Sequence, residues 1–129
     1  MESNIVYKSM SSPSVPGSQP ILLSITTDKL SYNLSEPVAI TIKNNGNQSL
    51  TFSDSALGLR IKNLNTGEIY RLIAAQVLTE LKPNESKTLT WKQEDNDGEQ
   101  INPGNFDATV TSGSLSANTI FKVEPKIAK

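Results

Sequence analysis

From residue 21 onward, apolar and polar residues alternate with a period of two, and this alternation is what most constrains the fold. The clearest runs are 38–42 and 106–110, in which every second residue is Val, Ile, Phe or Ala. Successive side chains of a strand point to opposite faces, so a period of two predicts half-buried strands. Turn residues separate the runs at intervals of about 8–12 residues, as in all-β domains.

Two short turns punctuate the alternation. Asn45-Gly46 and Asn65-Thr66-Gly67 each stand between two apolar runs and predict hairpins, with return strands beginning at Leu50 and covering 69–73. The stretch 70–81 fits either a short helix or a strand followed by a loop, and both readings stay open. The whole pattern predicts an antiparallel immunoglobulin-like β-sandwich of about seven to nine strands.

Composition divides the chain into three parts. Residues 1–20 are rich in Ser and Pro and predict a flexible tail or linker, residues 21–123 the sandwich, and residues 124–129 a C-terminal tail. No apolar run approaches the ~20 residues that a membrane-spanning helix needs. We expect a monomer or weak self-association, with strand addition by residues 4–8 to a neighbouring sheet as an alternative.

The residues that this chain lacks exclude many activities. It has no histidine and no cysteine, which removes Ser-His-Asp and Cys-His catalysis, thiolate zinc sites and disulfides. A net charge of −1 with mixed signs provides no basic stripe for nucleic acid. Paired carboxylates could still serve a glycosidase, but only 5% of the residues are aromatic. We therefore expect a non-enzymatic domain without a cofactor.

The segment 91–106, WKQEDNDGEQINPGNF, first suggests a calcium loop. An EF-hand needs Asp at position 1, Gly at 6 and Glu at 12. With Gly98 at position 6, Gln93 takes position 1 and Gly104 takes position 12, so both end ligands are missing. The EF-hand is rejected, and the segment reads as an exposed acidic loop. A different calcium site is left as a hypothesis, with the weak candidates Asp95, Asp97 and Glu99.

Other signals favour surface and core positions. Asn33, Asn47 and Asn84 each begin an Asn-x-Ser sequon at a predicted turn and are possible glycosylation sites. Together with the Ser/Pro-rich tail, they favour an extracellular or cell-envelope setting over the cytoplasm. Trp91 is in phase with Leu89 on a strand and is expected in the core. The cations Arg60, Lys62 and Arg71 are expected on a solvated face.

Trp91, Asp95, Gly98, Ile101, Pro103-Gly104 and Phe106 follow the order W-x(3)-D-x(2)-G-x(2)-[VI]-x-P-G-x-[YF]. This motif resembles the closing motif of the intracellular proteinase inhibitor (BsuPI-like) family. The segments VAITIKNNGNQSLTF, LGLRIKNLNTGEIYRL and LKPNESKTLTW resemble its upstream elements. Asn84 departs from the glycine that usually follows Pro83 there, and Phe106 replaces the usual tyrosine.

The resemblance implies an immunoglobulin-like domain that blocks a subtilisin-type serine protease through a protein–protein contact. An inhibitor presents an exposed, rigid loop to the protease cleft. Two loops are candidates, 53–58 and 93–104. The expected partner-binding residues are Ser53, Asp54, Ser55 and Ala56 in the first, and Glu94, Asp95, Asn96, Asp97 and Glu99 in the second. The competing hypothesis is an extracellular adhesion or scaffold module.

Overall fold

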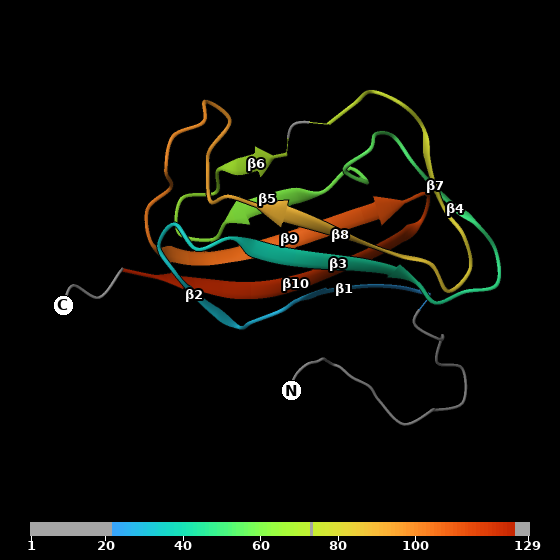
Figure 1. Cartoon of the computed structure of the whole chain (residues 1–129), viewed down its shortest axis with the longest axis horizontal. Coiled ribbons are helices and arrows are strands. Elements are labelled where there is room, and N and C mark those ends of the chain that lie inside the picture. Colours follow the sequence, from blue (N-terminus) through green and yellow to red (C-terminus); the bar gives the residue numbers. More distant parts are fainter. Residues whose placement is uncertain (1–21, 73, 126–129) are drawn as a thin grey trace.

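The computed structural model describes residues 22–72 and 74–125, which form an all-β sandwich of ten strands without a helix (Figure 1). Two sheets lie face to face, and a short two-stranded ribbon lies at one end. The predicted immunoglobulin-like β-sandwich is confirmed. Four strands have only three residues each, and these short strands raise the count above the expected seven to nine.

The first sheet has three antiparallel strands, in the order β1–β3–β8. Their bounds are Leu23–Thr27 for β1, Val38–Asn44 for β3 and Ser86–Trp91 for β8. The alternating side chains Val38, Ile40 and Ile42 are fully buried, as the period of two predicts. On the opposite face, the hydroxyls of Thr41 and Thr88 lie 2.9 Å apart across neighbouring strands.

The second sheet has the order β2–β10–β9–β5–β6. Its strands are β2 (Ser31–Asn33), β5 (Arg60–Asn63), β6 (Ile69–Arg71), β9 (Gly104–Ser112) and β10 (Leu115–Glu124). Its pairs are antiparallel except that β2 runs parallel to β10, a departure from the purely antiparallel prediction. Strand β10 extends one residue beyond the predicted domain limit, and the 1–20 tail lies outside the described residues.

The hairpin predicted at Asn65-Thr66-Gly67 is confirmed. Strands β5 and β6 pair across this turn, with Lys62 opposite Ile69. Gly67 takes a φ of 84°, which favours glycine. The buried Asn63 side chain accepts the backbone N–H groups of Asn65 at 2.8 Å and Thr66 at 3.2 Å. The predicted strand 69–73 ends at Arg71, and residue 73 lies outside the described part.

The hairpin predicted at Asn45-Gly46 is wrong. Strand β3 already has β1 and β8 on its two sides, so the following strand cannot pair with it. Instead β4 (Leu50–Phe52) pairs with β7 (Thr79–Leu81). The buried Asn44 amide holds this corner, donating to the carbonyls of Gln48 at 2.8 Å and Leu81 at 2.9 Å.

The described residues of the stretch 70–81, which are 70–72 and 74–81, are not helical. The stretch follows the strand-and-loop alternative, leaving β6 at Arg71 and entering β7 at Thr79. The end of this stretch is strand β7 because it pairs with β4, a strand that is distant in sequence. The described residues include no helix that is long and apolar enough to cross a membrane.

Five aromatic rings form the centre of the core. Trp91 projects from the first sheet and contacts rings of the second, with centroids 5.5 Å from Phe106 and 6.0 Å from both Phe121 and Tyr70. Tyr32 meets Phe121 edge to face at 5.7 Å. Trp91 and Phe106 are buried, which confirms the core position expected for the tryptophan. Aromatic pairs of this kind contribute about 0.5–1.5 kcal/mol beyond their buried area.

A hydrogen-bonded tyrosine holds the crossing from the first sheet to the second. The Tyr32 hydroxyl donates to Asp28 Oδ1 at 2.5 Å and accepts from the Lys29 backbone N–H at 3.0 Å. Asp28 Oδ1 also accepts the Ala39 N–H of β3 at 3.3 Å. The Tyr32 hydrogen bond lowers the pKa of Asp28, and burial raises the pKa of Tyr32. The ionised Asp28 therefore ties the two sheets together.

This linkage predicts a pH-dependent effect of Asp28→Asn. Because the pKa of Asp28 is lowered by folding, its contribution is present above the ordinary value of 3.8 and is lost as the pH falls through the folded value. We expect wild type to exceed the variant in free energy of unfolding at pH ~7, with the difference shrinking below pH ~4. Urea unfolding of both proteins measures this difference, and a gap that stays constant with pH would contradict the prediction.

Candidate protein-binding loops

The loop 53–58 is not the protruding loop that the sequence suggests. Ala56 is only 6% exposed and Leu57 is fully buried, so this part faces the core. The Asp54 carboxylate folds the loop inward by accepting the N–H groups of Ala56 at 3.0 Å and Gly58 at 2.9 Å. Ala56 is therefore withdrawn from a partner, contrary to its selection as an exposed binding residue. Ser53 lies at the exposed start of the loop.

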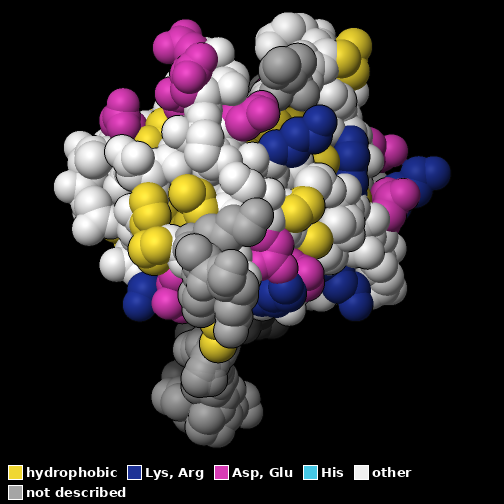
Figure 2. Space-filling model, turned by 60° about the vertical axis from the view of Figure 1, so that its left-hand side comes forward, with side chains coloured by type: hydrophobic (Ala, Val, Ile, Leu, Met, Phe, Trp, Pro, Cys, Tyr) yellow, Lys and Arg dark blue, Asp and Glu magenta, His cyan; other side chains and the backbone are white. Residues whose placement is uncertain are grey.

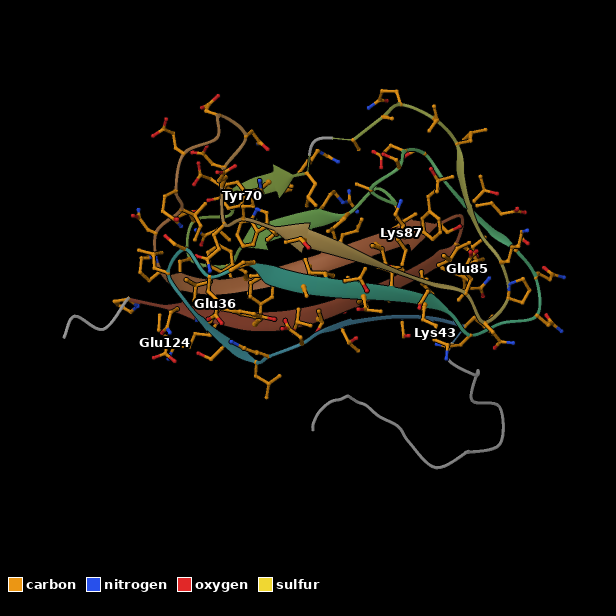
Figure 3. All side chains as sticks on the ribbon, viewed as in Figure 1. Glu36, Lys43, Tyr70, Glu85, Lys87 and Glu124 are labelled. Carbon is orange, nitrogen blue, oxygen red and sulfur yellow. The ribbon has the colours of Figure 1, made fainter. Side chains whose placement is uncertain are left out.

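Ser55 instead anchors the neighbouring loop 74–78. Its backbone N–H donates to the Ala75 carbonyl at 3.1 Å, and its Oγ accepts the Ala75 N–H at 2.9 Å. The Lys87 ammonium, reaching up from β8, donates to the Ser55 carbonyl at 2.5 Å (Figure 3). Two loops that are twenty residues apart in sequence are thus joined into one unit.

The tip of the anchored loop carries two exposed apolar side chains. Val77 is 55% exposed and Leu78 is 79% exposed. The Val77 N–H donates to the Ala75 carbonyl at 2.9 Å, and the Thr79 hydroxyl donates to the Val77 carbonyl at 3.1 Å. The tip is therefore bonded internally as well as to Ser55. Sequence reasoning missed this pair, because apolar residues without clear periodicity are not assigned to the surface by pattern.

The second candidate loop connects β8 with β9 and rests on a buried glutamine. Gln93 is fully buried and has a φ of 60°, which is uncommon for a residue with a side chain. Its Nε2 donates to the carbonyls of Asn33 at 2.9 Å and Glu36 at 2.7 Å, and its Oε1 accepts the Ser35 N–H at 2.9 Å. One side chain thus closes the turn between β2 and β3 under the acidic loop.

Asp95 organises the acidic tip. Its Oδ1 accepts the N–H groups of Asp97 and Glu99, each at 2.9 Å, and its carbonyl accepts the Gly98 N–H at 3.1 Å. Gly98 has a φ of 80°. Glu94, Asp97 and Glu99 are exposed, and acidic side chains project at the upper edge of this end of the molecule in Figure 2.

Asp95, Asp97 and Glu99 are not assembled as a ligand set. Within residues 22–72 and 74–125, no three acidic side chains converge in a way that could hold a metal ion. The Asp95 carboxylate is instead directed at the loop's own backbone.

Asn96 attaches the acidic loop to the edge of the second sheet. Its Oδ1 accepts the Arg71 N–H and its Nδ2 donates to the Ile69 carbonyl, both at 3.0 Å. It therefore takes the place that a further strand would take beside β6. Of the expected partner-binding residues in this loop, Asp95 and Asn96 have structural roles.

The other motif residues shape the return into β9. A Cβ placed on Gly104 would lie 2.5 Å from Asn65 Oδ1, which accepts the Asn105 N–H at 3.0 Å. The glycine therefore lets β9 pass close to the β5–β6 turn. Pro103 is exposed just before it, and Phe106 begins the buried alternation.

The three sequon asparagines are exposed, but the turn position predicted for all of them holds for Asn47 and Asn84 and not for Asn33, which is a strand residue. Asn33 ends β2, Asn47 lies in the corner after β3, and Asn84 lies in the turn before β8. Asn84 has a φ of 66°, a conformation that asparagine tolerates better than most residues and that glycine adopts freely.

The sequence matches no protein-family model, and no curated protein matches it. Among solved structures, it is similar to the DNA-bound alkylpurine DNA glycosylase AlkC of Pseudomonas fluorescens, with 16% identity, a TM-score of 0.44 and coverage of 79% of this chain and 30% of that chain. It is also similar to a Paenibacillus cycloisomaltooligosaccharide glucanotransferase, with 18% identity, a TM-score of 0.45 and coverage of 81% of this chain and 14% of that chain. A third similar structure is a PapD-like domain of human CEP192, with 13% identity, a TM-score of 0.40 and coverage of 96% of this chain and 99% of that chain. The chain thus spans less than a third of the first two proteins, and these likenesses assign it no activity.

We expect Gln93→Leu to destabilise the fold by about 2–3 kcal/mol. The substitution keeps the approximate size of the side chain but leaves the Glu36 carbonyl and the Ser35 N–H without their described partner, while the Asn33 carbonyl keeps only the Glu36 N–H. Each buried unpaired group costs about 1–3 kcal/mol when no water replaces the bond. Chemical unfolding measures the effect. The control is Gln48→Leu, a change at an exposed glutamine whose side chain makes no described hydrogen bond. Equal stability of the Gln93 variant and wild type would contradict the role of the amide.

Proposed function

We propose that this chain is a non-enzymatic protein-binding domain that contacts its partner through Val77 and Leu78. The observation that carries the proposal is the exposure of Leu78, 79%, at the tip of a loop bonded to Ser55. Isolated exposed apolar residues are common on protein surfaces. Here two exposed apolar residues are adjacent. The loop that carries them is hydrogen-bonded, through Ala75, to Ser55 of the neighbouring loop 53–58.

Rigid presentation favours binding. A loop that is held in place before binding loses less conformational entropy when it docks, so more of the contact energy becomes affinity. The two bonds between Ser55 and Ala75 and the Lys87 contact provide this restraint. A large apolar side chain that enters a pocket on the partner is a frequent source of binding energy at interfaces.

The partner class that we propose is a subtilisin-type serine protease, as the resemblance to BsuPI-like inhibitors implies. Such a protease would receive Leu78 in an apolar specificity pocket, since a hydrophobic slot accepts a large uncharged side chain. We propose the loop 74–78 as the inhibitory loop in place of 53–58, because Ala56 and Leu57 are buried. Loop 53–58 then acts as its support.

We expect Leu78→Asp to raise the inhibition constant against a subtilisin-type protease about tenfold or more, since loss of a buried anchor costs 1.4 kcal/mol or more. Hydrolysis of a small chromogenic substrate measures the inhibition. The matched control is Leu30→Asp, because Leu30 is 78% exposed in the segment between β1 and β2. Ser55→Ala should weaken inhibition and promote cleavage of the loop.

Two results would overturn the proposal. One is wild-type protein that fails to slow the protease at micromolar concentration. The other is a Leu78→Asp variant that inhibits as well as Leu30→Asp does. Circular dichroism of each variant verifies that the sandwich is intact.

A further inference from the structure

The outer face of the second sheet carries exposed cations on two neighbouring strands. Arg60 of β5 lies directly opposite Arg71 of β6, and Lys62 lies two residues further along β5, opposite Ile69. Side chains directly opposite each other are about 4.5–5.5 Å apart at Cβ, and like charges there are destabilising. Within the described ranges, the one ion pair closer than 4 Å joins Lys29 and Glu36, so none of these three cations forms an ion pair there, although Asp107 of β9 lies directly opposite Lys62.

The acidic loop lies beside this basic face. Its Asn96 side chain is bonded to the backbone of Ile69 and Arg71, so the loop is attached at the outer edge of β6 and lies beside that strand (Figure 1). Among the described residues, none of its carboxylates comes within 4 Å of a Lys or Arg nitrogen. Unpaired charges of opposite sign therefore stand next to each other on one molecule. These carboxylates belong to Glu94, Asp95, Asp97 and Glu99.

Exposed isoleucines accompany the cations. The register aligns Ile69, Lys62, Asp107 and Ile120 in one row across β6, β5, β9 and β10. Ile69 is 43% exposed and Ile120 is 54% exposed. The Asp107 carboxylate of this row accepts the Asn118 amide at 3.1 Å. The face thus combines three cations and the Asp107 carboxylate with apolar area.

We propose that this face binds a second copy of the chain, in a twofold dimer in which the acidic loop of each copy covers the Arg60, Lys62 and Arg71 side chains of the other. A twofold contact is self-complementary, so it suits a surface on which basic and acidic groups are adjacent. Asn96 occupies the edge of β6, so the dimer that we propose forms by contact of faces and not by strand pairing along β6. Exposed ion pairs are weak and screened by salt, so the dimer is weak and salt-sensitive.

Charge reversal tests the dimer. Sedimentation of the wild-type chain at about 100 µM should show reversible dimerisation at about 50 mM NaCl that disappears at about 500 mM. The double variants Arg60→Glu/Arg71→Glu and Asp97→Lys/Glu99→Lys should each raise the dissociation constant about tenfold or more. An equimolar mixture of the two variants should recover association, because opposite charges then meet again. Asp95 is left intact because it caps the loop backbone.

The control is Lys43→Glu/Lys82→Glu, which reverses two exposed cations outside the second sheet and should dimerise like wild type. Wild type that stays monomeric at low salt would overturn the proposal. A dimer that survives both charge reversals, or a mixture that does not recover association, would also overturn it. Protease inhibition by the charge-reversed variants is measured in parallel, so that failure of the dimer is distinguished from failure of the Leu78 loop.

Discussion

The contact of Trp91 with the opposite sheet is the interaction on which the rest of the structure depends. Its ring lies within 6.0 Å of Phe106, Phe121 and Tyr70, all of which belong to the second sheet. Its Nε1 donates to the Glu94 carbonyl at 3.0 Å, so the residue that joins the sheets also fixes the start of the acidic loop. A buried indole needs such an acceptor. Core packing and loop position are therefore coupled.

Buried side-chain amides hold the backbone in place at other turns. Asn44, Asn63 and Gln93 are each less than 6% exposed, and each bonds to backbone groups of a nearby loop. Backbone groups in a loop need partners when they are removed from water. In a chain without disulfides, these side chains supply the partners, and Gln93 does so at the base of the acidic loop.

The candidate sites were only partly predictable from the sequence. The acidic loop could be recognised because its charges require solvent, and its exposed position followed from that. The role of Asn96 could not, because its partners on β6 lie 25 and 27 residues away. Loop 53–58 was misjudged because the burial of Ala56 and Leu57 depends on a turn made by Asp54. Val77 and Leu78 were missed because an apolar residue is exposed only when the folded chain leaves it so.

The sequence by itself determined the all-β class, the inward-facing residues of β3 and β9, and the turn at Gly67, because these depend on side-chain period and local backbone preference. Only the tertiary structure decided strand partners. The turn after β3 looks like a hairpin locally, but β1 and β8 occupy both sides of β3, so β4 pairs with β7. Pairing depends on which edges remain free once the sheets have assembled, and a local pattern does not contain that information.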